Sequence, residues 1–121
     1  MAIQKWSDEI IVAELADDPH FTEEMTNLAD MLATRPSNVV LNLGTVTFLN
    51  SSNIARLLRL RKQMISSGSR LVLAGLNNQV WGVFLVTGLD KVFEFTNDVA
   101  TALATIQLTP APEAHGSARP R

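Results

Sequence analysis

The amino-acid sequence predicts an α/β fold in which a mostly parallel, mixed sheet is flanked by helices. Short apolar segments typical of strands alternate along the chain with segments whose apolar residues recur at helical spacing. The resulting order is ββαβαβαβα, and strands that are joined through helices pair in parallel by right-handed crossovers. The first two strands follow each other directly, so we expect a hairpin that adds one antiparallel edge. The length of 121 residues fits one domain.

The chain begins with the elements of a hairpin and a helix. Residues 3–7 and 10–15 are expected to be the two strands, with a tight turn between them. The period of the apolar residues then changes to i, i+4, i+7 and i+11, which marks one face of a helix. This face consists of Phe21, Met25, Leu28 and Leu32. The helix is expected to begin at Phe21 and to end before Pro36, because the residue ahead of a proline avoids the helical region.

A central strand and a long helix are expected next. Residues 39–43 form an almost continuous apolar run, as in a strand that is covered on both faces. A helix then begins where Asn50, Ser51 and Ser52 offer three good capping side chains in a row, and Gly68 is expected to end it. Its apolar face is expected to consist of Ile54, Leu57, Leu58 and Ile65. The opposite, solvated arc carries Arg56, Arg59, Lys62 and Gln63.

Two more strands and two more helices follow. Residues 71–76 are expected to be a strand, residues 79–87 a helix, and residues 92–95 a short strand. Asn97 is expected to cap a last helix, whose buried face consists of Val99, Leu103 and Ile106. Residues 109–121 are rich in proline, alanine and polar residues, so we expect a disordered tail there. The single domain is therefore assigned to residues 1–108.

Charge and composition exclude several classes of function. The formal net charge is −2, with 10 basic and 12 acidic residues, which provides no general attraction for nucleic acid or anionic lipid. There is no cysteine, so disulfides, thiolate metal sites and cysteine nucleophiles are excluded. No apolar run approaches the length of a membrane span, and the first residues lack the pattern of a signal peptide. We therefore expect a cytoplasmic protein that binds neither nucleic acid nor membrane.

The residues able to carry chemistry do not form a catalytic pattern. His20 and His115 have no partner residues at the spacing of metal ligands or of a catalytic triad. The glycines are scattered and do not form a phosphate-binding loop. Asp90 and Glu94 are too isolated to act as an acid–base pair. The sequence therefore predicts no enzyme activity, no metal site and no cofactor.

One segment carries a resemblance to a known family. Residues 41–54 read LNLGTVTFLNSSNI, and the likeness continues through the strand at 70–76 and on to residue 106. This pattern resembles the signature of the STAS domain, the fold of bacterial anti-sigma-factor antagonists. There, a strand of the type Leu-Asp-Leu is followed by Val-x-Phe, and Asp-Ser-Ser-Gly or Asp-Ser-Thr-Gly opens the next helix. The order of elements derived above matches the fold of this family.

The resemblance implies a function in partner switching. In the antagonist class, an anti-sigma factor with an ATP-binding kinase fold phosphorylates the second hydroxyl residue of the motif, which corresponds to Ser52. Ser51 is the second choice, and a PP2C-type serine phosphatase would reverse the step. A phosphate at a helix N-terminus meets free backbone N–H groups and the positive end of the helix dipole. The alternative is that Asn50, Ser51 and Ser52 serve only as the helix cap.

The sequence departs from the family signature at three positions. Asn42 stands at the position of the strand aspartate, Asn50 at that of the motif aspartate, and Asn53 at that of the motif glycine. Asparagine caps a helix about as well as aspartate, so the fold need not change. Negative charge around the hydroxyl group is lost, however, and this predicts altered recognition by the kinase or by the partner. The residues assigned to partner binding are Asn50, Ser51, Ser52, Asn53, Arg56, Trp81 and Leu85.

The helix at 79–87 is apolar all round, which raises the question of what covers it. Its buried face is expected to consist of Val80, Val83, Phe84 and Thr87. Trp81 and Leu85 lie together on a different face, where relatives usually carry charged residues. Either Trp81 folds back over the neighbouring helix or under the tail, or it anchors an interface with a partner or in a homodimer.

Two alternative functions remain open at this stage. The first is a scaffold subunit of a larger stress-signalling or transport assembly, in which STAS domains associate with one another. The second is a nucleotide-binding regulatory domain, although no glycine loop and no aromatic clamp supports it.

Overall fold

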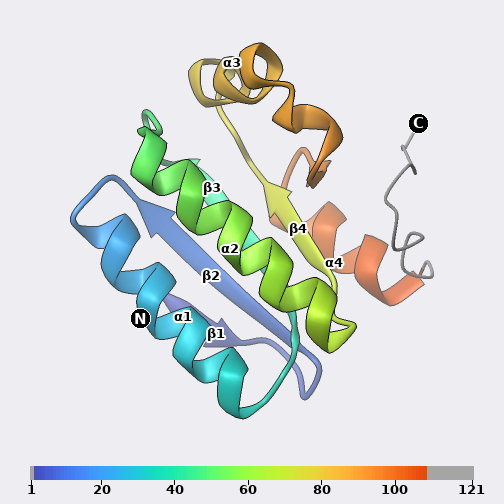
Figure 1. Cartoon of the computed structure of the whole chain (residues 1–121). Coiled ribbons are helices and arrows are strands. Elements are labelled where there is room, and N and C mark those ends of the chain that lie inside the picture. The colour runs from blue at the N-terminus through green and yellow to red at the C-terminus, as the bar shows by residue number, and fades with distance from the viewer. Residues whose placement is uncertain (1, 109–121) are drawn as a thin grey trace.

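The computed structural model describes residues 2–108, so the expected disordered tail at 109–121 lies outside the described residues. The strands are β1 (Ile3–Lys5), β2 (Ile10–Ala16), β3 (Asn38–Thr45), β4 (Leu71–Ala74) and β5 (Glu94–Thr96). The helices are α1 (His20–Thr34), α2 (Ser51–Ser67), α3 (Asn78–Thr87) and α4 (Val99–Leu108), with a short 3-10 helix at Leu89–Lys91. Figure 1 shows α1 and α2 side by side on one face of the sheet and α4 behind it.

The sheet confirms the predicted α/β class. Its five strands lie in the order β1-β2-β3-β4-β5. The β1–β2 pair is antiparallel, and the other three pairs are parallel. Each crossover passes through a helix, as the alternation of strand and helix patterns predicts. Because the strands run in parallel from β2 to β5, the segments that leave their carboxyl ends meet at one edge of the sheet.

Both faces of the central strand are buried, because helices cover both faces of the sheet. On β3, Val39, Leu41 and Leu43 belong to the core under α1, α2 and α3. Val40 belongs to a smaller core on the other face, where Ala102 of α4 is fully buried. This explains why β3 is a nearly continuous apolar run, in which the alternation of a half-exposed strand is absent.

The buried face of α2 differs from the predicted one. The structure buries Asn53, Leu57, Leu60 and Met64. Leu58 and Ile65, which were expected in the core, are 39% and 47% exposed. Gln63, which was expected on the solvated arc, turns toward α1 and donates a hydrogen bond to the Ala29 carbonyl. The prediction was right for Leu57, which is buried, and for Ile54, which packs against the core. The buried face is displaced toward Leu60 and Met64, which the prediction omitted.

The last third of the chain differs from prediction mainly at its boundaries. Strand β4 ends at Ala74, because Gly75 takes a left-handed φ of +78° and turns the chain. The side chain that caps α4 is that of Asp98 and not Asn97, since its Oδ1 accepts the Thr101 N–H at 2.7 Å. Thr87, expected on the buried face of α3, is exposed, and its hydroxyl donates to the Val83 carbonyl.

Candidate functional site

The candidate site is the first turn of α2, at the carboxyl edge of the sheet. Asn50 is its N-cap, and its Oδ1 accepts the Asn53 N–H at 2.8 Å. The Asn53 Oδ1 accepts the Asn50 N–H in return, at 3.1 Å, which completes a capping box. Ser51 and Ser52 are the first two residues of the helix, and both are exposed. The N-cap predicted from the sequence is therefore present, and the two hydroxyl residues lie beside it at the surface.

Two aspartates at the end of β2 fix the loop before α2 and the turn itself. Asp17 accepts two hydrogen bonds from Thr47, from the backbone N–H at 2.8 Å and from the hydroxyl at 2.6 Å. Asp18 accepts the Asn53 Nδ2 at 2.9 Å on one oxygen, and the N–H and hydroxyl of Thr22 on the other. Asp17 thus holds the loop before α2 at Thr47, and Asp18 holds the first turn of α2 at Asn53.

Asn53 faces into the protein. It is 3% exposed, and its amide oxygen and nitrogen are both engaged, with Asn50 and Asp18. Asn53 was predicted to bind the partner, but its side chain instead stabilises the turn that presents Ser51 and Ser52. The asparagine at this position supplies a reciprocal cap that a glycine could not make.

Asn42 also has a local structural role. Its Oδ1 accepts the Gly44 N–H at 2.9 Å. The same oxygen lies 3.1 Å from where a Cβ on Gly44 would be and 3.2 Å from one on Gly75. The amide therefore fits against two glycine backbones at the ends of β3 and β4. The same end of β4 is joined to the loop by Asn77, which caps α3 and donates from Nδ2 to the Val46 carbonyl at 2.8 Å.

These hydrogen bonds lower the pKa values of both aspartates. The Thr22 hydroxyl, followed by the Asn53 amide and the Thr22 N–H, lowers the pKa of Asp18 to about 2. The hydroxyl and N–H of Thr47 lower the pKa of Asp17 below its usual value. Both groups are therefore charged throughout the physiological pH range, and they supply negative charge close to the first turn of α2.

We predict that Asp18→Asn lowers the melting temperature at pH 7, because the charged acceptor of Thr22 and Asn53 is lost. The folded-state pKa of about 2 lies below the ordinary aspartate pKa of 3.8. The stabilisation from this carboxylate is therefore complete above the unfolded-state value and is lost as the pH falls toward the folded-state value. The difference between wild type and variant should shrink over this interval in a series of thermal melts. A difference independent of pH would contradict the role given to the Asp18 charge, and Asp8→Asn, at an exposed position, is the control.

Comparison with known proteins identifies the fold family. The sequence profile of the STAS domain matches residues 3–102. The chain belongs to the STAS domain family.

Solved structures of other STAS proteins share the fold. An anti-sigma-factor antagonist domain protein from Planctomyces limnophilus is 21% identical, with a TM-score of 0.73 over 87% of this chain and 97% of that chain. The Bacillus anti-sigma factor antagonist SpoIIAA is similar in its unphosphorylated form, at 15% identity and a TM-score of 0.75 over 90% and 97% of the two chains. Its phosphorylated form matches at 14% identity and a TM-score of 0.68 over 86% and 96%. A serine-to-glutamate variant of RsbS from Moorella thermoacetica matches at 15% and 0.73, over 88% and 96%.

The two residues of α3 that were proposed to form an interface, Trp81 and Leu85, differ in their exposure. Trp81 is half-buried and packs edge-on against Phe95 of β5, with ring centroids 5.0 Å apart. It thus folds back onto β5, and the position expected under the tail lies outside the described residues. Leu85 and Val86 are 51% and 88% exposed. The exposed apolar surface of α3 therefore centres on these two residues, and whether a partner covers it stays a prediction.

Sequence reasoning missed the two aspartates that hold the site. Asp17 and Asp18 lie between the strand expected at 10–15 and the helix expected to begin at Phe21, where no motif marks them. Their position directly after a parallel strand was the available signal, because such ends share an edge with the motif loop. Within residues 2–108, no three His, Asp or Glu side chains gather closely enough to bind a metal ion. In the same residues, no helix combines the length and apolarity needed to cross a membrane.

Proposed function

We propose that this STAS domain is a protein-interaction module that is switched by phosphorylation of Ser52. It acts as an anti-sigma-factor antagonist and regulates transcription by partner switching. The observation that carries the proposal is the pair of exposed hydroxyl groups at the first two positions of α2. They lie beside a cap that is held by Asp18 after β2 and a loop that is held by Asn77 after β4. Ser51 is the second candidate for the modified residue.

The helix start suits a phosphate electrostatically. The first N–H groups of a helix have no acceptor within the helix, and the capping box satisfies only that of Asn53 in the turn that carries the serines. A phosphate on Ser52 would add a charge of about −1.5 to −2 at this positive end of the dipole. It would also add to the negative charge that Asp17 and Asp18 supply close to this turn, which is enough to reverse a contact with another protein.

The solved relatives support this mode of regulation. SpoIIAA has been determined in both unphosphorylated and phosphorylated forms, and RsbS with a glutamate in place of a serine. We infer that the partner of the present chain is an anti-sigma factor that is also a serine kinase with an ATP-binding kinase fold. A PP2C-type phosphatase would restore the free hydroxyl. All of these would meet in the cytoplasm, and the domain itself would contribute no catalytic group.

The test uses two substitutions at Ser52 and an anti-sigma factor of the kinase class. We expect Ser52→Asp to weaken binding at least tenfold, about 1.4 kcal/mol, because it places a permanent charge on the contact surface. Ser52→Ala should bind like the unphosphorylated wild type. Titration calorimetry measures both. Equal affinities of all three proteins would refute the switch at Ser52, while the capping role of Asn50 would remain.

A second candidate function is that of a scaffold subunit in an assembly of STAS domains. It is favoured by the exposed Leu85 and Val86 on α3, a helix without any charged residue. Size-exclusion chromatography with light scattering separates the two functions, because a scaffold should self-associate and a simple antagonist need not.

A further inference from the structure

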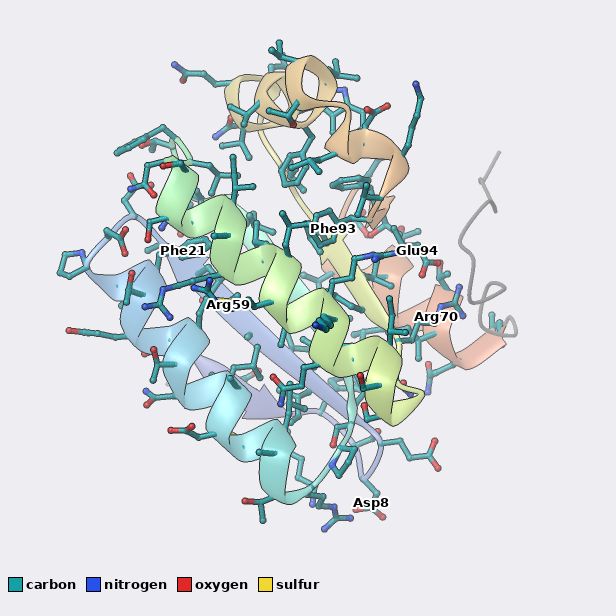
Figure 2. All side chains as sticks on the ribbon, in the orientation of Figure 1. Asp8, Phe21, Arg59, Arg70, Phe93 and Glu94 are labelled. Atoms are coloured by element: carbon teal, nitrogen blue, oxygen red, sulfur yellow. The ribbon has the colours of Figure 1, made fainter. Side chains whose placement is uncertain are left out.

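A groove between α1 and α2 contains two guanidinium groups that form no salt bridge with a carboxylate of residues 2–108. Its volume is about 250 Å³. It is lined by Met25, Thr26, Ala29 and Asp30 of α1 and by Arg56, Arg59, Leu60 and Gln63 of α2. Figure 2 shows Arg59 between the two helices. The floor is apolar, and two guanidinium groups come from the same wall.

The two arginines of the groove differ from other arginines of the protein. Nε of Arg61 donates to the Val92 carbonyl at 2.9 Å, and Nε of Arg70 donates to Glu94 at 3.0 Å. Nε of Arg56 is buried and has no acceptor among the described residues. Its Nη1 reaches the Thr26 hydroxyl only at 3.5 Å. Within the same residues, neither Arg56 nor Arg59 lies within salt-bridge distance of a carboxylate, although Asp30 lines the groove.

The size and chemistry of the groove define what it can hold. Cofactor and drug-sized sites occupy roughly 300–1,000 Å³, so this groove is too small for a nucleotide and suits a single side chain or a small acid. The guanidinium group of an arginine recognises a planar oxyanion such as a carboxylate through two parallel N–H donors. The apolar floor, formed by Met25, Ala29 and Leu60, suits the methylene groups of a short side chain. A carboxylate on a short apolar stem, as in glutamate, satisfies both parts of the site.

The position of the groove indicates the source of this carboxylate. Ser52, Arg56, Arg59 and Gln63 follow one another at i, i+4, i+7 and i+11, so the switch serine and the groove lie on one stripe of α2. We propose that the groove receives an acidic side chain of the partner protein, with Arg56 and Arg59 as its counter-ions. This inference rests on the function proposed above, because it places the groove inside the partner surface that begins at Ser52.

The arrangement also suggests how phosphorylation reaches the groove. Residues four apart on a helix are neighbours, so a phosphate on Ser52 lies within reach of the Arg56 guanidinium. That guanidinium would pair with the phosphate and would no longer be available to the acidic side chain. The switch would then act by competition for Arg56 as well as by repulsion at the helix start.

A two-dimensional amide spectrum of the full chain, titrated with N-acetyl-glutamate amide, tests the site without a kinase or phosphorylation. We expect saturable shifts at residues 25–30 and 56–63, and none with the matched glutamine compound. Arg56→Gln and Arg59→Gln should each weaken binding at least about fivefold, since each removes a charge-assisted hydrogen bond. Lys62→Gln, at an exposed position of the same helix that does not line the groove, is the control and should leave binding unchanged. Asp30→Asn should tighten binding by removing a like charge.

The outcomes of the titration distinguish a failure of the groove proposal from a failure of the Ser52 switch. Absent shifts, equal shifts with the glutamine compound, or insensitivity to both arginine substitutions would overturn the proposal. Succinate binding far more tightly than the glutamate probe would also overturn it, because the site would then serve a free small acid. Arg59 is exposed, so its variant remains informative if Arg56→Gln fails to fold. If Ser52→Asp leaves partner binding unchanged while the glutamate probe binds as expected, the switch fails and the groove stands.

Discussion

Phe84→Ala is expected to lower the free energy of unfolding by about 3–5 kcal/mol, as deletions of large buried aromatic side chains do. Phe84 is fully buried, and its ring meets Phe93 and Phe95 edge-on at centroid distances of 5.9 and 5.1 Å. Val80 and Phe84 are the two buried residues of α3. Loss of the Phe84 ring would therefore remove one of the two side chains that attach this helix to the core. The effect is large, because a domain of this size has only about 5–15 kcal/mol of net stability.

Chemical denaturation of the purified variant measures this effect. Leu85→Ala is the matched control, because the neighbouring side chain is 51% exposed and its truncation should change stability by no more than about 0.5 kcal/mol. A loss of less than about 1 kcal/mol in Phe84→Ala would show that α3 is held by contacts other than this aromatic cluster.

Arg70→Gln is expected to cost about 3 kcal/mol, because it leaves Glu94 partly buried without its counter-ion. Nε and Nη2 of Arg70 donate hydrogen bonds to the two carboxylate oxygens of Glu94, at 3.0 and 2.6 Å. The two side chains are 10% and 23% exposed. Both residues are labelled in Figure 2. The Arg70 guanidinium also donates to the Thr105 carbonyl of α4. One side chain thus joins the start of β4 to β5 and to α4, three elements at the end of the chain.

An exposed ion pair provides the comparison for Arg70. Lys5 and Asp8 lie 3.9 Å apart with side chains 52% and 91% exposed, and such pairs contribute less than about 1 kcal/mol. Lys5→Gln should therefore change the denaturation midpoint very little. If Arg70→Gln were no more destabilising than Lys5→Gln, the bidentate pair would have no structural role. Replacing Arg70 and Glu94 together by Met and Leu should recover much of the loss, because no buried charge is then unpaired.

The order of elements and the class of the fold could be predicted from the sequence, because the apolar period changes clearly between strands and helices. The regular stripe of α1 is an example: Phe21, Met25, Leu28 and Leu32 are all buried as expected. The orientation of α2 could not be predicted in the same way. Its apolar residues form one broad arc, so their spacing does not show which part of the arc is buried, and the polar Asn53 is one of the residues that define the inner face.

The candidate site was predictable in part. The capping sequence gave the start of α2 within one residue, since Asn50 is the N-cap. The role of Asn53 depends on Asp18, which lies 35 positions earlier in the chain, and no local pattern reveals such a contact. The apolar character of α3 likewise showed that some residue must be exposed. It could not show that Trp81 packs on Phe95 while Leu85 and Val86 remain at the surface.

A phosphate on Ser52 is expected to control binding, and the affinity of the phosphorylated protein itself measures this most directly. The full chain is incubated with ATP and an anti-sigma factor of the kinase class, the modified residue is mapped by mass spectrometry, and both forms are titrated with that factor. We predict modification at Ser52 and at least tenfold weaker binding of the phosphorylated form, about 1.4 kcal/mol. An unmodified Ser52, or equal affinities of the two forms, would contradict the account.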